Sequence, residues 1–258
     1  MYVINSSYLK PVNDDCFIDK YADDSYLIVP AGSDAHIMSE LYNIENWAIE
    51  NNLKLNKTKS VEMVVYRNEN SKKSNPMPNL LPEITRVESI KILGVQIDNH
   101  LSVHEHVEMV CQTAAQALYG IKILKSHGLD QHSIYCVCHA VVLSRLLYAA
   151  PAWWGFASAT DRTKLQAVLN RAMKWGFYKG TDPSVEQACA KRERHLFTNV
   201  LADPSHVLHQ FLPPAKPQQY DLRARAHNRL LPVKNNLLIC KNFLTRMLYQ
   251  TLMHPDPV

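Results

Sequence analysis

The sequence lacks several features that mark common protein classes. Its start, MYVINSSYLK, has no basic stretch followed by a long apolar one, so we predict no secretory signal peptide. It has no glycine-rich phosphate loop and no internal repeat, which argues against a P-loop nucleotide site and a repeat architecture. The most apolar stretch, residues 134–157, is interrupted by His139, Arg145 and Pro151, which favours a buried helix over a membrane span. We therefore expect an intracellular protein, nuclear or cytoplasmic, with no membrane partner.

The six cysteines lack the Cys-x-x-Cys spacing that is typical of structural zinc sites. Cys136 and Cys138 lie in an apolar helical stretch, and we interpret both as core thiols. A zinc site could be drawn from these two together with Cys189 and His195, but their spacing fits no structural zinc pattern. We therefore expect no zinc ion at these four residues.

Charge is distributed unevenly along the 258 residues, of which 47% are apolar and 20% charged, as in a globular protein. Residues 1–100 carry a net charge of −4, residues 101–210 one of +3 and residues 211–258 one of +5. An acidic first part and a basic remainder are compatible with a cation site and a polyanionic partner. Solvated surface would give the same asymmetry, so charge alone does not select a function.

The first hundred residues show strand patterns around one amphipathic helix. Residues 16–29 predict a β-hairpin, because β-branched and aromatic residues flank a short polar turn in which Asp tolerates unusual backbone angles. Strands are also expected at about residues 60–66 and over residues 89–98. Ser33 or Asp34 is expected to cap the helix, and its apolar face is formed by Ile37, Leu41, Ile44 and Ala48.

From about residue 101 the pattern changes to the helical period. A long helix is predicted to end at Gly128, and its apolar face is formed by Val103, Val107, Val110, Ala114, Leu118 and Ile121. Further helices are expected at about residues 132–149 and 160–177, followed by an irregular, proline-bearing stretch at 178–258. The sequence therefore predicts an α+β chain in three parts: residues 1–100, 101–178 and 179–258.

Two adjacent carboxylates, Asp23 and Asp24, stand at the expected hairpin tip in the stretch CFIDKYADDSYLIVP. Like charges repel, and no Lys or Arg lies between them, so another group should neutralise them. A hard divalent cation such as Mg²⁺ takes carboxylate oxygens as ligands, and a rigid hairpin would hold those oxygens in place. A solvated turn is the alternative explanation, because Asp is a common turn residue.

The order of the surrounding segments favours the cation, because it resembles a known polymerase family. FIDKYADDSYLIV is similar to the catalytic hairpin of non-LTR retrotransposon reverse transcriptases, most closely the jockey type, with Tyr21–Asp24 as its Tyr-Ala-Asp-Asp box. NNLKLNKTKSVEMVV resembles the family's next motif at Leu55, Asn56, Lys59 and Met63. IKILGVQID resembles its primer-grip motif at Leu93, Gly94 and Asp98.

The resemblance continues to the end of the chain, where LLYAAPAWWG and YDLRARAHNRLLP are similar to segments downstream of the polymerase. It implies a partial palm at 1–100, an all-helical thumb at 101–178 and a basic tail at 179–258. The implied activity is RNA-directed DNA polymerisation with Mg²⁺ or Mn²⁺ as cofactor. The implied partners are an RNA template, a DNA primer and deoxynucleoside triphosphates.

The resemblance also implies roles for single residues. Asp23 would bind the catalytic metal ions, Asp24 would be its partner carboxylate, and Tyr21 would lie beside the primer end or the template. Lys59 would lie near the triphosphate, where a cation offsets charge on the leaving pyrophosphate. A surface lysine in a Lys-rich loop is the alternative for Lys59.

Further contacts to primer or template are expected from Leu93 and Gly94 and from the arginines at 223, 225 and 229. Gly94 would let the primer strand approach the backbone, and a β-bulge at this glycine is compatible with that role. Arg223, Arg225 and Arg229 would bind phosphates in a salt-sensitive way, or else belong to a solvated tail.

Two other pairs are interpreted as structural. His104 and His106 are two residues apart on a helix, so they point in different directions, and we expect both at the surface. Trp153 and Trp154 could stack on bases, but large aromatic residues more commonly pack a core.

Parts of the family's polymerase have no counterpart in the sequence. A third metal-binding Asp, the fingers region and a Pro-Gln-Gly motif do not fit into the 15 residues before Cys16, and Asp14, Asp15 and Asp19 belong to the approach to the hairpin. We therefore expect a reverse transcriptase fragment that does not polymerise alone. A non-catalytic nucleic-acid-binding module and an inert relic are the alternatives.

Overall fold

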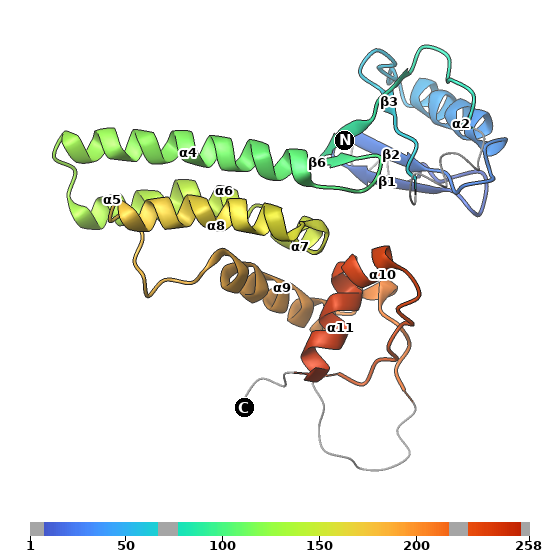
Figure 1. The fold of residues 1–258 in the computed structure, drawn as a ribbon. Helices are drawn as coiled ribbons and strands as arrows, with labels where there is room; N and C mark the ends of the chain where they lie inside the picture. The colour runs from blue at the N-terminus through green and yellow to red at the C-terminus, as the bar shows by residue number, and fades with distance from the viewer. Residues whose placement is uncertain (1–7, 67–76, 217–226, 254–258) are drawn as a thin grey trace. The chain divides into compact units, whose positions relative to one another are not determined.

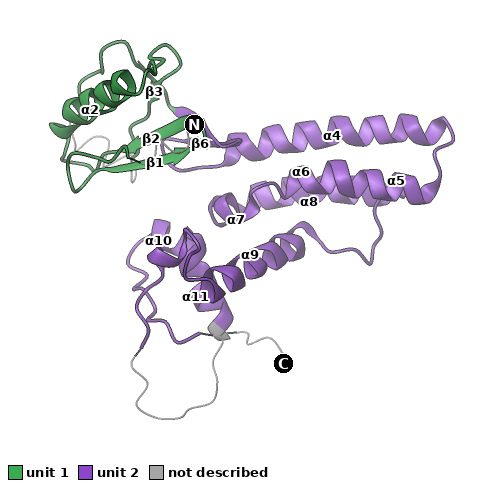
Figure 2. Cartoon of the chain, turned by 180° about the vertical axis from the view of Figure 1, so that it is seen from behind, with its two compact units in different colours: residues 1–88 green, residues 89–258 purple. Residues whose placement is uncertain are grey.

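The computed structural model describes residues 8–66, 77–216 and 227–253. The chain has mixed α+β structure and divides into two compact units, residues 1–88 (unit 1) and residues 89–258 (unit 2), which Figure 2 distinguishes by colour. The stretch at 89–98, which the sequence grouped with the first hundred residues, belongs to unit 2.

Unit 1 begins with the predicted β-hairpin. Strands β1 (Phe17–Tyr21) and β2 (Asp24–Ile28) pair antiparallel, with Phe17 opposite Ile28 and Tyr21 opposite Asp24. Helix α2 (His36–Glu50) follows the hairpin, as the sequence predicted (Figure 1). The hairpin and its helix are therefore confirmed as elements of the fold.

The start of α2 differs from the expectation. The residue before the helix is Ala35, and no side chain caps it, so capping by Ser33 or Asp34 is wrong. The Ser33 hydroxyl donates its hydrogen bond to the Asp15 carboxylate instead, which removes it from the helix. The predicted apolar face is confirmed as the inner face: Ala48 is buried, and Ile37, Leu41 and Ile44 are half-buried.

The second predicted strand is much shorter than expected. Strand β3 (Val61–Glu62) has two residues and pairs in parallel with β4 (Thr85–Arg86), so the expected strand at 60–66 is wrong in extent. The pairing is reinforced by an ion pair of 2.7 Å between Arg86 Nε and Glu62 Oε2. A strand extends only as far as its partner supplies backbone groups, and β4 supplies two residues.

The single strand expected at 89–98 is a second hairpin. Strands β5 (Ser89–Ile92) and β6 (Val95–Asp98) pair antiparallel, and Leu93 and Gly94 form the two-residue turn between them. Both turn residues have positive φ, 46° and 89°, as the right-handed twist of a tight hairpin requires. Gly94 therefore serves a turn, and the predicted bulge inside a strand is wrong.

Unit 2 is built on long helices, of which α4 (His104–Ser126) lies alongside α8 (Ala159–Lys174) in Figure 1. Between them run α5 (Gln131–Val137), a π-helical segment η1 (Cys138–Leu143), α6 (Ser144–Leu146), α7 (Ala150–Trp153) and the 3-10 turn η2 (Trp154–Phe156). The predicted apolar face of α4 is confirmed, since four of its members are at most 1% exposed: Val103, Val107, Ala114 and Leu118. Gly128, with φ of 91°, ends the helix as predicted.

The apolar stretch after α4 lies in the core of this unit. Among the described residues, Gln131–Phe156 is the one helical stretch long and apolar enough to cross a membrane. Its residues at helical spacing are fully buried against the neighbouring helices: Ile134, Cys138, Val142, Leu146 and Ala150. The arrangement fits the expected buried helix.

The stretch 178–258 is not irregular throughout, which corrects the expectation. It contains α9 (Val185–Ala202), η3 (His209–Phe211), α10 (Leu237–Lys241) and α11 (Phe243–Met253). Helix α9 begins with a capping box, in which the Ser184 and Gln187 side chains each accept from the other's backbone N–H. The first half of the helix packs in the same core as α4, and its second half packs in a second core that includes Phe197, Val200, Met247 and Leu248.

Burial corrects two further interpretations. His106 is 2% exposed and packs its ring edge-on against Trp153, at 5.2 Å between ring centroids, so its expected surface position is wrong. Cys136 is exposed, so of the two expected core thiols only Cys138 is buried. Trp153 and Trp154 are buried, as predicted for core aromatics. His104 is exposed and binds Asp161, at 2.7 Å from its Nδ1 atom.

Candidate active site

The first hairpin places the two adjacent carboxylates at its apex. Tyr21 pairs with Asp24, so Ala22 and Asp23 alone form the turn. The left-handed backbone angle falls on Ala22, with φ of 51°, and not on an Asp as the turn chemistry suggested. The structure therefore brings Tyr21, Asp23 and Asp24 together at one end of the hairpin.

The apex is open to solvent. Tyr21 is 64% exposed, and Asp23 and Asp24 are both exposed. A carboxylate at the surface can bind a cation together with the cation's water ligands, which is how Mg²⁺ is commonly held. The same exposure is compatible with a plain solvated turn, so the chemistry of the apex depends on what approaches it.

Lys59 lies in a separate turn that follows α2. Its backbone N–H donates to the carbonyl of Asn56, at 3.1 Å, and its side chain is exposed. The neighbouring Lys57 forms ion pairs with Glu45 and Glu83, at 2.6 and 3.0 Å. The hydrogen bonds to these two carboxylates raise the pKa of Lys57. Lys57 is thus tied to the fold, whereas Lys59 presents its ammonium group to solvent.

The predicted primer-grip residues form the turn of the second hairpin, in unit 2. Tyr148 lies over this turn and donates its hydroxyl hydrogen to the carbonyl oxygen of Leu93, at 2.9 Å. A Cβ atom added at Gly94 would lie 3.1 Å from Tyr148 Cε1. An aromatic side chain of the same unit thus lies close to Gly94, and the expected approach of a primer strand stays a prediction.

The tail arginines are only partly described. Arg223 and Arg225 lie outside the described residues. Arg229 is half-buried, and its guanidinium group lies 3.3 Å from both the Pro213 carbonyl and His209 Nε2. Arg229 thus holds two loops of unit 2 together, in addition to any contact with a phosphate.

A second group of polar side chains lies at the base of the first hairpin, and the sequence reasoning missed it. Asp15 and Cys16 precede β1, and His36 opens α2. Asp15 Oδ1 lies 3.1 Å from His36 Nδ1 and 3.7 Å from Cys16 Sγ. An adjacent Asp-Cys pair before a strand and a His after it is the only sequence signal, because spacing alone does not show that the hairpin brings its two ends together.

Electrostatics at this base follow from burial and hydrogen bonding. The Ser33 hydroxyl is the main cause of the lowered pKa of Asp15. Burial raises the pKa of the Cys16 thiol, and the negative charge of Asp15 acts in the same direction. Burial also raises the pKa of Glu40, but hydrogen bonds from Asn13 and Val12 outweigh it and leave that pKa below its ordinary value. The segment before β1 is therefore fixed against α2 by a buried carboxylate.

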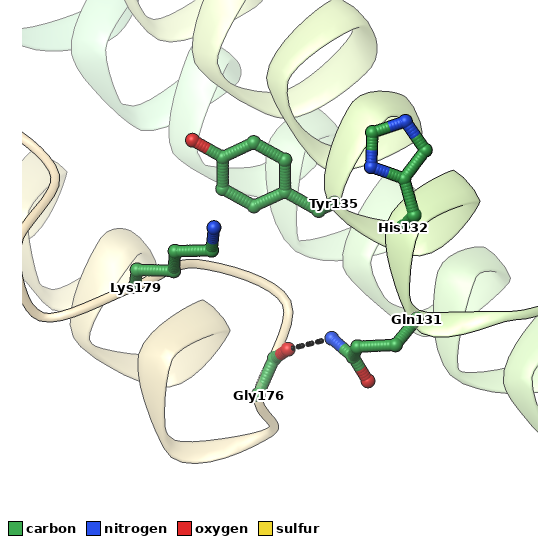
Figure 3. Close-up of a pocket in the computed structure, with 5 residues that line it drawn as sticks. All are labelled: Gln131, His132, Tyr135, Gly176 and Lys179. Carbon is green, nitrogen blue, oxygen red and sulfur yellow. Dashed lines mark hydrogen bonds between the residues drawn. The ribbon is translucent and has the colours of Figure 1, made fainter.

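Unit 2 presents three lysines around the loop that follows α8, and we call them the lysine cluster. Lys122 lies over the Trp175 ring at 5.6 Å, and Lys125 Nζ donates to the Trp175 carbonyl at 3.3 Å. Lys179 lies over the Tyr135 ring at 4.6 Å and lines a pocket of about 240 Å³ with Gly176, Gln131 and His132 (Figure 3). Cations beside aromatic rings are a common feature of nucleic-acid contacts.

The comparisons with known proteins add nothing to these observations. No family model, curated protein or solved structure matches the chain. Function is therefore inferred from the residues and their arrangement.

Proposed function

We propose that the chain is part of an RNA-directed DNA polymerase of the non-LTR retrotransposon type, contributing the end of the palm and the thumb. The observation that carries the proposal is the hairpin β1–β2, with Tyr21, Asp23 and Asp24 exposed at its apex. A two-residue turn between paired strands fixes both carboxylates relative to the backbone, which positional catalysis requires. The ordered series of sequence motifs described above supports the same function.

In this function Asp23 and Asp24 would hold a divalent cation, Mg²⁺ or Mn²⁺. A bound cation supplies charge stabilisation for nucleotidyl transfer. Tyr21, on the strand end beside the turn, would contact the primer end or template through its exposed ring. Lys59, with an exposed ammonium group, would offset charge on a triphosphate. We expect this chain alone to be inactive, because the family's site needs a third metal-binding carboxylate that has no counterpart in this sequence.

The metal-binding part of the proposal predicts a paramagnetic effect at the hairpin apex. Mn²⁺ added to the labelled chain should broaden the backbone amide signals of residues 21–25 in two-dimensional NMR spectra. Asp23→Asn should weaken Mn²⁺ binding at this position at least about tenfold, because it removes one of the two carboxylate ligands. The titration midpoint of the broadening measures the change.

Asp19→Asn is the matched control, since Asp19 is an exposed carboxylate on the same hairpin, in β1. It should leave the midpoint unchanged. If both variants weaken Mn²⁺ binding equally, the binding is due to general charge attraction, and the proposal is contradicted.

In a primer-extension assay the chain alone should be inactive. Extension that Asp23→Ala abolishes would show the expected inactivity to be wrong.

A second candidate function, a non-catalytic nucleic-acid-binding module, is favoured by the charge of unit 2. Residues 89–258 contain 19 Lys and Arg against 11 Asp and Glu, a net charge of +8. The lysine cluster places three of these cations beside Trp175 and Tyr135 at one place on the unit. Binding through such a surface needs neither Asp23 nor a metal ion.

This candidate predicts salt-sensitive binding that depends on the lysine cluster. Replacing Lys122, Lys125 and Lys179 together by Gln should reduce the slope of log K against log salt by about 2–3, one for each phosphate that is no longer neutralised. Fluorescence anisotropy with a labelled RNA–DNA hybrid measures the slope. The control replaces three exposed cations elsewhere in unit 2 by Gln: Lys191, Arg194 and Lys216. An equal loss in both triple variants would indicate net charge alone.

A further inference from the structure

The group at the base of the first hairpin has no part in the function proposed above. We propose that Asp15, Cys16 and His36 bind one Zn²⁺ ion. They are, among the described residues, the one group of three or more metal-ligating side chains whose donor atoms all lie within 4.8 Å of one another. The proposal does not depend on the polymerase assignment, because neither Asp23 nor Asp24 belongs to the group.

Two of the three distances between the donor atoms are close to those of a tetrahedral ion. Zinc bonds of about 2.0 Å to oxygen and nitrogen and about 2.3 Å to sulfur imply tetrahedral edges of about 3.3 Å for O···N and about 3.5 Å for O···S. The structure has 3.1 Å between Asp15 Oδ1 and His36 Nδ1, and 3.7 Å between Asp15 Oδ1 and Cys16 Sγ. The third pair, Cys16 Sγ and the His36 ring nitrogen, lies within 4.8 Å, so side-chain adjustment would have to complete the coordination sphere.

The chemistry of the donors selects the kind of metal. A thiol, an imidazole and a carboxylate are the three ligand types that zinc uses, whereas Mg²⁺ prefers oxygen alone. A bound cation would also counter the burial and the Asp15 charge that disfavour the Cys16 thiolate in the bare protein. Three protein ligands leave one tetrahedral position, and the Asp15 and His36 side chains, each 40% exposed, leave it open to water.

Neighbouring residues hold the ligands in place. The Ser33 hydroxyl donates to Asp15 Oδ2, so that Oδ1 remains directed toward Cys16 and His36. The buried Glu40 carboxylate accepts hydrogen bonds from the backbone of Val12 and Asn13, at 2.9 and 2.7 Å, which fixes the segment before Asp15 to helix α2. In zinc sites, hydrogen bonds from surrounding residues orient the metal ligands in this way.

The position of the site gives the ion a structural consequence. Asp15 and Cys16 lie just before β1, and His36 begins the helix after β2. A single ion would therefore join the two ends of the segment that carries the hairpin. Because the unfolded chain does not hold these ligands together, binding should stabilise unit 1 against unfolding.

Cobalt substitution tests the proposal on the full-length chain, reduced and freed of metal. Co²⁺ should produce a thiolate-to-cobalt charge-transfer band that saturates at one equivalent, together with the strong visible bands of tetrahedral Co²⁺. Zn²⁺ should displace it and raise the melting temperature. Cys16→Ser should remove the charge-transfer band, and His36→Gln should weaken Co²⁺ and Zn²⁺ binding at least about tenfold.

The matched control is Cys136→Ser. Cys136 is an exposed thiol whose Sγ atom lies 3.7 Å from His132 Nε2, so it forms the competing Cys-His pair, without a carboxylate. This variant should leave the band and the affinity unchanged. Ser33→Ala should weaken binding less than His36→Gln does.

Three outcomes overturn the proposal: no charge-transfer band in the wild-type chain, a band that Cys136→Ser removes, or a band that survives Cys16→Ser. Cys16 is buried, so its replacement could also disturb the fold. His36→Gln and Asp15→Asn, at half-exposed positions, keep the test valid. If both retain the wild-type circular dichroism spectrum and the wild-type affinity, the site is excluded.

Discussion

Replacement of Glu193 by Ala is expected to destabilise unit 2 by about 3 kcal/mol, because it leaves a largely buried guanidinium group without its counter-ion. Glu193 lies on α9 with its side chain 2% exposed, and Arg246 lies on α11 with its side chain 14% exposed. The two groups form a bidentate pair, in which Arg246 Nη1 donates to Glu193 Oε2 at 3.2 Å and Nη2 donates to Oε1. The free energy of unfolding from urea denaturation, followed by circular dichroism, measures the loss.

Two variants separate the pair from a general effect of charge. Glu108→Gln breaks the solvent-exposed pair with Lys164, whose Nζ lies 2.7 Å from Glu108 Oε1, and should cost less than about 1 kcal/mol. The double replacement Glu193→Leu with Arg246→Met should recover much of the stability that Glu193→Ala loses, because no unpaired charge remains. A double variant no more stable than Glu193→Ala would show that packing, rather than the orphaned charge, causes the loss.

Replacement of Gly155 by Ala is expected to destabilise unit 2 by about 3 kcal/mol or more, because the added methyl group has no room. A Cβ atom at this position would lie 2.0 Å from the backbone carbonyl oxygen of Lys241 and 2.5 Å from Arg246 Nε. Arg246 Nε donates to the same Lys241 carbonyl, at 3.1 Å, so the methyl group would also separate a hydrogen-bonded pair. The expected result is a lower urea midpoint, with α10 and α11 displaced from η2.

Gly120 provides the matched control for this effect. It lies on the exposed side of α4, and a Cβ atom added there meets nothing within 4 Å. Gly120→Ala should therefore be neutral or stabilise the protein by up to about 1 kcal/mol, through the higher helix propensity of Ala. If Gly155→Ala were as mild as Gly120→Ala, the close contact between η2 and the segment 241–246 would be wrong.

Much of the local structure was predictable because it depends on neighbours in sequence. The hairpin at 17–28 follows from β-branched and aromatic residues around a two-residue turn. The face of α4 follows from apolar spacing, and its end from Gly128, where a positive φ favours glycine. The exposed apex with Tyr21, Asp23 and Asp24 was predictable for the same reason, since a short turn keeps its residues together.

The predictions that were wrong concern features that depend on partners distant in sequence. The length of β3 is limited by the two residues of β4 that pair with it. The second hairpin was missed because the residues of its turn continue the pattern of a strand. The burial of His106 is decided by Trp153, about fifty residues later. Helices α9 and α11 depend on each other for a shared apolar core, so neither is evident from its own segment.

The sequence by itself therefore determined the hairpin with its adjacent carboxylates, the long amphipathic helices and the unequal distribution of charge. Each of these depends on backbone preferences and on spacing within one segment. The tertiary structure alone decided the contacts between segments: Tyr148 over the turn at Leu93 and Gly94, the buried pair of Glu193 and Arg246, and the meeting of Asp15 and Cys16 with His36. A chain shows the order of its residues, whereas only folding brings the two ends of a hairpin within ligand distance of each other.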